Sequence, residues 1–351
     1  MRLFVSFFAL LFGALGAWAF PVLPLWSTPE NPAYLNQVPQ IILSAKEEVL
    51  VALSDIRAYT DGTTNPLLSA LSEVAKKEGK VYVLMESSTR PLASEQEAAL
   101  SRLRAAGANV KEDSPEITLH TKFLVIDRRV VVVGSTHWTK TALTGSIQVD
   151  LVLEEPAVAA LFRQFFFYLW EGKVDTKTQL PSRPWPEPAL IPLLDFPDSK
   201  ANFTALHHLL GQAQREVSLL LYELAFYPAY SDSPSTLLLQ ALVEAARRGI
   251  KVRVLLESGE RDTRLAETNK LGAAWLSAYG IEVRFDSPQT IMHAKCLIVD
   301  GCHVWVSSAN WNYYSLAKNV EGGVLILGAP ELANPLGAYF LNLWEVCVPL
   351  R

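Results

Sequence analysis

An internal duplication constrains the fold of this 351-residue chain more than any other feature. The clearest block reads Leu-His-Thr-Lys at residues 119–122 and returns as Met-His-Ala-Lys at 292–295, an offset of 173 residues (from 120 to 293). The flanking blocks keep the same offset: Asp-Ser-Pro at 113–115 and 286–288, and two apolar residues plus Asp at 125–127 and 298–300. Repeats this long and this few indicate two fused copies of one unit rather than a solenoid.

Each copy alternates predicted strands and helices. The apolar runs Val49–Leu53 and Val217–Leu221 are typical of buried strands. A helix of apolar period follows each run, and Val81–Met85 and Val252–Leu256 predict a second strand in each copy. Strands that alternate with helices favour an α/β layered fold.

The duplication also predicts the domain boundaries. We expect an N-terminal half at residues 20–172 and a C-terminal half at 193–351, joined by a linker at 173–192. This linker contains Pro181, Pro184, Pro186, Pro188 and Pro192, which favour a stiff, extended connection.

The first residues are typical of an export signal. Arg2 precedes an apolar run from Leu3 to Ala17, and Ala17-Trp18-Ala19 supplies small residues where a signal peptidase cuts. The alternative is an uncleaved membrane anchor, but the run is shorter than the roughly 20 residues that a spanning helix needs. We therefore predict a signal peptide at residues 1–19, cleavage after Ala19, and an exported protein, periplasmic or extracellular.

The candidate chemical groups follow one pattern in both copies: His-x-Lys, then Asp, then Ser followed by a polar residue, then a polar residue and a carboxylate. In the second copy these are His293, Lys295, Asp300, Ser307-Ser308-x-Asn310 and Asn319-x-Glu321. In the first copy they are His120, Lys122, Asp127, Gly134-Ser135-x-His137 and Gln148-x-Asp150. Both stretches resemble the HKD motif of the phospholipase D superfamily, and the flanking repeats extend the resemblance over nearly the whole chain after residue 19.

The spacing has a physical interpretation of its own. The motif is rich in apolar and β-branched residues, so we expect it on a strand, where side chains two residues apart point the same way. A turn at Asp127 or Asp300 then reverses the chain and brings Ser135 or Ser308 back alongside. Each copy thus presents an imidazole, an ammonium and a hydroxyl to one point.

This set of groups suits the cleavage of a phosphodiester. Lys122 and Lys295 can stabilise the charge of the phosphoryl group. Donors from four further residues are expected to bind substrate: Ser135, Ser308, Asn310 and His137. No cluster has the spacing of metal ligands, so we expect neither a metal nor another cofactor.

The resemblance implies the rest of the mechanism. It implies two tandem α/β/α sandwich halves related by pseudo-twofold symmetry, with one shared active site at their interface and a phosphohistidine intermediate. It also implies that Asp150 and Glu321 orient the histidine of their own copy. Asp127 and Asp300 stand among the candidate catalytic residues as members of the motif, although the resemblance and the turn preference of Asp favour a structural role.

The two copies differ at three places, and the first is the less typical. His137 stands where the family has Asn, Gln148-x-Asp150 replaces Asn-x-Glu with two extra residues before it, and Ser307 stands where the family prefers Gly. A protonated His137 would disfavour the charged form of His120, and Glu321 would favour the charged form of His293. We therefore expect His120 to be the nucleophile and His293 the general acid.

The substrate stays open between two classes. Half of the residues are hydrophobic and 19% are charged, which excludes a disordered chain. The net charge of −5 gives no bulk attraction to nucleic acid, so phospholipid hydrolysis or phosphatidyl transfer is our first hypothesis. An exported nuclease is the second, and a protein that binds phosphodiesters without turnover is the third. We expect a monomer, an internal pseudo-dimer that needs no protein partner.

Overall fold

The computed structural model describes residues 20–77, 80–87, 92–174, 180 and 185–349, so the predicted signal peptide lies outside the described residues. The first copy contains β1 (Val22–Ser27), α2 (Ala33–Leu43), β2 (Glu48–Leu53), α3 (Pro66–Lys76), β3 (Lys80–Met85), α4 (Ser94–Ala105), β4 (Asn109–Glu112), β5 (Lys122–Ile126), β6 (Val130–Gly134), α5 (Lys140–Thr144), β7 (Ser146–Glu154) and α6 (Pro156–Trp170). The second contains β8 (Ala189–Asp195), α7 (Ala201–Gln212), β9 (Glu216–Leu221), α8 (Pro234–Arg247), β10 (Lys251–Leu256), α9 (Thr263–Ser277), β11 (Glu282–Phe285), β12 (Ile291–Met292), β13 (Lys295–Val299), β14 (His303–Ser307), α10 (Tyr313–Ala317), β15 (Glu321–Leu327), α11 (Pro330–Val346) and β16 (Val348–Pro349).

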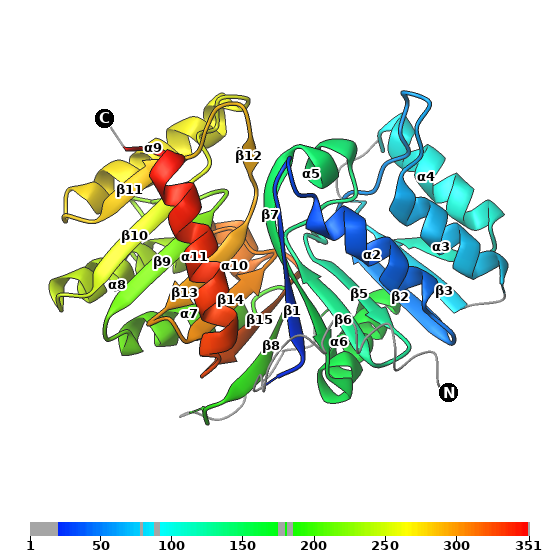
Figure 1. The fold of residues 1–351 in the computed structure, drawn as a ribbon, viewed down its shortest axis with the longest axis horizontal. Helices are drawn as coiled ribbons and strands as arrows, with labels where there is room; N and C mark the ends of the chain where they lie inside the picture. The colour runs from blue at the N-terminus through cyan, green and yellow to red at the C-terminus, as the bar shows by residue number, and fades with distance from the viewer. Residues whose placement is uncertain (1–19, 78–79, 88–91, 175–179, 181–184, 350–351) are drawn as a thin grey trace.

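Each copy forms one mixed sheet with the same strand order. The first sheet runs β1-β7-β6-β5-β2-β3-β4, and the second runs β8-β15-β14-β13-β9-β10-β11-β16. In both sheets three neighbouring strands are parallel, β2-β3-β4 and β9-β10-β11, and the strands on the HxK side are antiparallel. The predicted α/β fold of two repeated halves is confirmed, and the halves lie side by side (Figure 1).

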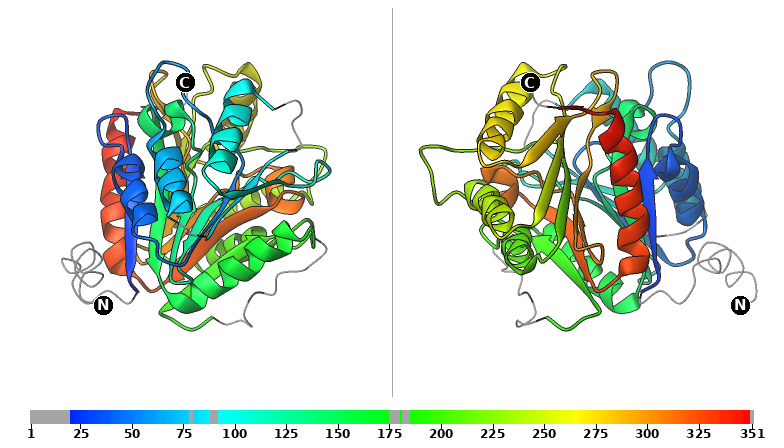
Figure 2. Two further views of the ribbon diagram at one scale, coloured as in Figure 1. Left: turned by 90° about the vertical axis from the view of Figure 1, so that its right-hand side faces the viewer. Right: turned by 60° about the vertical axis from the view of Figure 1, so that its left-hand side comes forward.

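Three apolar clusters hold the layers together. One lies between the first sheet and its outer helices α2, α3 and α4, and another between the second sheet and α7, α8 and α9. The third joins the inner faces of both sheets with α6 and α11, and includes Phe123, Phe162 and Phe340. Figure 2 shows α11 beside β1 of the other copy. The inner cluster therefore fixes one half against the other.

The two halves also share backbone hydrogen bonds. Strand β12 of the second copy pairs with β7 of the first, with Met292 opposite Ile147. In the mirrored position, Leu119 of the first copy forms a bridge with Val320 of the second. Both contacts lie directly before a catalytic-motif histidine. The interface and the HxK segments are therefore one structural unit.

The predicted linker is shorter than expected at its C-terminal end. Residues 189–192 belong to β8, where Pro192 lies opposite Val324 of β15. A proline is tolerated there because β8 is the edge strand of its sheet and needs no N–H on its free side. The prolines at 181 and 184 lie outside the described residues. Among the described helices, none is long and apolar enough to cross a membrane.

Candidate active site

The two histidines lie where the halves meet. Each precedes the strand that begins with its motif lysine, so only the lysine is on the strand predicted for the whole motif. The backbone N–H of His120 donates to Val320 O at 2.9 Å, and that of His293 donates to Ile147 O at 2.8 Å. Each histidine is thus held by the backbone of the opposite copy.

The orienting side chain of His120 also comes from the opposite copy. His120 Nδ1 lies 2.9 Å from both carboxylate oxygens of Glu321, which is fully buried. Burial lowers the pKa of His120, and the charge of Glu321 opposes that shift. Burial alone would raise the pKa of Glu321, but His120 and Lys122 bring it below its usual value. Nδ1 therefore carries a proton toward a carboxylate, which leaves Nε2 free to react.

His293 has neutral partners instead. Its Nδ1 lies 3.1 Å from Ser135 O and 3.3 Å from Gln148 Oε1, both in the first copy. Burial and then Lys295 hold the pKa of His293 well below its usual value. Both Nδ1 neighbours are acceptors, so Nδ1 carries the proton and Nε2 faces Lys295 Nζ at 3.1 Å.

These contacts correct the predicted orienting pairs. Glu321 orients His120 rather than His293, and Asp150 binds Thr136 N and Thr136 Oγ1 rather than a histidine. The residue that corresponds to Glu321 is Gln148, since the offset of 173 (from 148 to 321) holds here too. The two extra residues inferred from Gln148-x-Asp150 do not exist.

The departures at Asp150 and Ser307 have one cause: the two copies place a required glycine on different strands of the same pair. Gly134 lies opposite Asp150 in the first sheet, and Ser307 lies opposite Gly323 in the second. A Cβ at Gly134 would lie 2.5 Å from Asp150 Oδ1, and one at Gly323 would lie 2.6 Å from Ser307 Cβ. Each pair needs one glycine, and the copies place it on opposite strands.

The motif lysines are buried beside the histidines. Lys122 Nζ donates to His120 O at 2.6 Å, and Lys295 Nζ donates to His293 O at 2.7 Å. Burial lowers the pKa of Lys122 to about 7, and burial and Lys122 together bring the pKa of Lys295 well below its usual value. Protonation of both lysines is unfavourable in this buried place. It becomes favourable once an anion lies between the two side chains. The site is therefore suited to an anionic substrate.

The two predicted serine ligands support the orienting side chains. Ser135 Oγ lies 2.8 Å from Gln148 Oε1, Ser308 Oγ donates to Glu321 Oε2, and neither serine is exposed. Their role is to hold Gln148 and Glu321 in place, which differs from the predicted contact with substrate.

His137 and Asn310 occupy corresponding positions of the two copies. The His137 ring centroid lies 5.0 Å from that of His293 and 6.2 Å from that of His120. Burial and then Lys122 hold the pKa of His137 well below its usual value, so it does not supply the charge assumed from sequence. Asn310 is buried, and its Oδ1 has no partner among the described residues. Substrate binding by these two residues stays a prediction.

Sequence reasoning missed Tyr222. Its ring centroid lies 4.6 Å from that of His293 and 4.9 Å from Lys295 Nζ, so it covers both groups. The corresponding residue of the first copy is Ser54, whose Oγ lies 3.1 Å from His137 Nδ1. Both residues directly follow the first predicted strand of their copy, which was the available signal.

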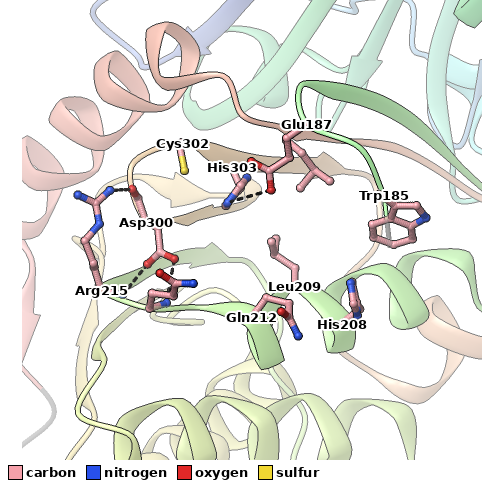
Figure 3. Close-up of a pocket in the computed structure, with 11 residues that line it drawn as sticks. Trp185, Glu187, His208, Leu209, Gln212, Arg215, Asp300, Cys302 and His303 are labelled. Atoms are coloured by element: carbon pink, nitrogen blue, oxygen red, sulfur yellow. Dashed lines mark hydrogen bonds and ion pairs between the residues drawn. The ribbon is translucent and has the colours of Figure 1, made fainter. Parts of the chain in front are cut away.

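Asp127 and Asp300 lie at the far ends of β5 and β13, about 16 Å along the strand from the motif lysines. Their φ angles are 50° and 56°, and their carboxylates accept backbone N–H groups of 46–48 and 214–216. Figure 3 shows Asp300 beside Arg215 in a cavity of about 490 Å³ at this remote end. The assignment of both aspartates as catalytic is therefore wrong, because they stabilise turns.

The described residues contain no group of three or more His, Cys, Asp or Glu side chains placed to hold a metal ion. The ammonium groups of Lys122 and Lys295 are the candidate sources of positive charge for a bound anion.

The crossed pairing makes a prediction that separates Glu321 from Asp150. Glu321→Gln is expected to lower kcat about 100-fold, because the amide cannot stabilise positive charge on His120. Asp150→Asn, the matched control, is expected to change kcat only a few-fold, because Asp150 binds Thr136. Steady-state kinetics on a chromogenic diester measures both. Equal losses of kcat in the two variants would contradict the crossed pairing and support the predicted one, in which each carboxylate orients the histidine of its own copy.

Comparison with known proteins identifies the family of the chain. The family model described as "Cardiolipin synthase, PLD-like domain" matches residues 38–170 and 206–344, more than half of the chain. Cardiolipin synthase B of Shigella flexneri is 26% identical over 323 residues, which cover 84% of this chain and 74% of that protein. A mitochondrial cardiolipin hydrolase of Chlamydomonas reinhardtii is 30% identical over 117 residues, 33% of this chain, and the match spans about half (51%) of its own length.

Among solved structures, phosphatidylserine synthase of Haemophilus influenzae Rd KW20 has the same fold. Its TM-score is 0.74 at 15% identity, with 94% of this chain and 87% of that chain covered. The resemblance predicted from the two motifs is confirmed. Since one family model matches both copies of the repeat, the chain belongs to the phospholipase D superfamily and is an enzyme of the phosphodiesterase class.

Proposed function

We propose that this enzyme acts on phospholipids, as a phospholipase D-type hydrolase or a phosphatidyl transferase, through a phosphohistidine at His120. The observation that carries the mechanism is the crossed pairing of two unequal histidines in one site. Relatives named as cardiolipin synthases and cardiolipin hydrolases support the lipid class.

The proposed first step uses His120 as nucleophile. His120 Nε2 attacks phosphorus and forms an N–P bond, while the bond from phosphorus to the leaving alcohol breaks. Positive charge that develops on the ring is stabilised by the Glu321 carboxylate at Nδ1. Lys122 and Lys295 stabilise the charge on the phosphoryl oxygens. This assignment keeps the predicted nucleophile but rests on the opposite pairing of Glu321.

The proposed acid is His293. Its neutral partners stabilise an imidazolium less than a carboxylate does, so a protonated His293 releases its proton readily to the leaving alcohol. The negative charge of a bound diester favours that protonated form. The neutral ring then takes a proton from water, for hydrolysis, or from a second alcohol, for transfer, as that oxygen attacks the phosphohistidine.

An exposed group of tyrosines on the second copy, called here the tyrosine rim, is a further argument for a lipid substrate. Tyr230, Tyr313 and Tyr314 are exposed and line a cavity of about 590 Å³ beside the loop that follows Asn310. Tyrosine is favoured where an apolar surface meets water, as at a lipid headgroup layer. Export, proposed from residues 1–19, would give such a rim access to a membrane surface.

The substrate class is tested with the purified chain in EDTA. We expect release of headgroup from vesicles of phosphatidylglycerol or cardiolipin, and phosphatidylethanol when ethanol is added, because an alcohol can replace water on the phosphohistidine. Activity should survive EDTA, since the lysines supply the positive charge. The His120→Ala variant is the blank. Shortening of single-stranded DNA with intact vesicles would make the enzyme a nuclease instead.

A further inference from the structure

Each catalytic histidine segment rests on a pair of carboxyl groups that the chemistry above does not use. In the first copy the pair is Glu86, after β3, and Asp113, after β4. In the second copy it is Glu257, after β10, and Asp286, after β11. Both glutamates and Asp286 are buried, at 6%, 4% and 2% exposure. Asp113 is partly exposed, so the fully buried pair is Glu257 and Asp286, whose hydrogen-bonded contact needs a reason.

The pairs bind the peptide that directly precedes each histidine. Met292 N–H donates to Glu257 Oε2 at 2.7 Å and lies 3.0 Å from Asp286 Oδ2. In the first copy Leu119 N–H donates to Glu86 Oε2. The aspartates are fixed from the other side, since Asp286 Oδ1 accepts Ser258 N–H at 2.7 Å. The carboxyl groups thus determine where the backbone enters the site.

Burial and the neighbouring glutamate favour the protonated form of the aspartate in each pair. Burial and then the charge of Glu257 raise the pKa of Asp286 to about 8. Burial and then Glu86 raise the pKa of Asp113 to about 7. Two carboxylates that touch in a buried place cannot both ionise without strong repulsion. The protonated aspartate can donate to its glutamate while the glutamate accepts the backbone N–H.

Other charged and titratable groups face the pairs from neighbouring elements. The charge of Glu86 acts to raise the pKa of Lys122, and the charge of Glu257 acts to raise the pKa of Tyr222. Lys122 and Tyr222 both lie in the active site. Cys347 faces Asp286 from the C-terminal segment, with Arg284 nearby. Gly259 N–H donates to Glu257 Oε1 at 3.0 Å. None of these contacts removes the repulsion that a second ionisation would create.

We propose that each pair is a proton-sharing carboxyl clamp that positions the catalytic histidine of its copy. With one proton, the clamp holds Leu119 or Met292 and places the following imidazole. Loss of that proton puts two negative charges together, separates the side chains and lets the histidine segment shift. The clamp residues are positioning residues, and they touch no substrate.

The test is Asp286→Asn, which keeps an amide donor toward Glu257 but cannot ionise. We expect the ratio of variant to wild-type kcat/KM on bis(p-nitrophenyl) phosphate to rise about tenfold from pH 6 to pH 9, because at a pKa near 8 about one clamp in ten keeps its proton at pH 9. The ratio cancels titrations that both proteins share, including that of Lys122. Glu73→Gln, which removes an exposed charge on α3, should give a flat ratio.

Thermal unfolding provides a readout that needs no substrate. The pKa of Asp286 lies above the usual value of about 4 for an aspartate in an unfolded chain, so its contribution to stability is complete below about pH 4 and is lost as pH rises through about 8. The Tm difference between Asp286→Asn and wild type should therefore grow from pH 5 to pH 9. If no diester is hydrolysed, the proposed function fails while this measurement still tests the shared proton.

Two results would overturn the clamp. A flat Tm difference would mean that Asp286 is ionised throughout and shares no proton. A Tm difference that grows while the kcat/KM ratio stays flat would mean that the shared proton does not position His293. Asp286→Ala removes the oxygens that accept the backbone N–H groups of Ser258 and Met292, so it is expected to lower kcat at every pH.

Discussion

Replacement of His120 or His293 by alanine is expected to lower kcat by about 10³-fold or more in each case. The two imidazoles serve one site, and each is oriented by a side chain of the other copy, Glu321 for His120 and Gln148 for His293. Neither copy therefore contains a complete set of catalytic groups. Initial rates on a chromogenic diester and circular dichroism of each variant are the measurements.

His207→Ala is the matched control, because His207 is exposed on the outer helix α7. That variant should keep its rate. Retention of about half the rate in either catalytic variant would mean that each copy works alone, and the single shared site would be abandoned.

Trapping of the covalent intermediate has the second large expected effect. With a p-nitrophenyl diester, whose leaving group needs little acid assistance, the His293→Ala variant should release about one equivalent of nitrophenol and then stall. The phosphohistidine persists because the imidazole that activates water in the proposed second step is absent. Rapid quench followed by peptide mapping should place the phosphoryl group on His120.

The reciprocal variant serves as the control. His120→Ala should give no burst and no adduct, since the nucleophile is absent. A phosphoryl group on His293, in the wild type or in His120→Ala, would reverse the roles of the two histidines and with them the meaning of the Glu321 contact.

Much of the fold could be read from the repeat. The apolar runs placed β2, β3, β9 and β10 correctly, because buried strands carry dense apolar runs, and both copies have them. The edge strand β8 was hidden by its own proline, since a proline excludes a residue from a central strand but not from an edge.

The site was predicted less completely, for a physical reason. Spacing within one copy identifies groups on one strand, but it says nothing about which copy supplies a neighbour. Glu321 and Gln148 reach across the interface, so the pairing depends on how the two sheets pack. Tyr222 belongs to neither motif. Its place in the site follows from the packing of its ring against that of His293.

The turn aspartates show the opposite limit. Asp127 and Asp300 keep their spacing as strictly as the lysines do, yet they bind backbone at the far ends of β5 and β13. A motif marks positions that the two copies share, and a turn with a positive φ angle restricts a residue as firmly as a reaction does.

Glutamate at 321 and glutamine at 148 have a consequence for symmetry. In a homodimer of identical subunits, the two positions would hold the same residue, and both histidines would have equal partners. A single gene that encodes both copies lifts this restriction, so one imidazole can keep an anionic partner while the other keeps a neutral one. Fusion thus gives the two ends of the site different partners, and in the proposed mechanism this difference determines which imidazole attacks phosphorus and which one donates a proton.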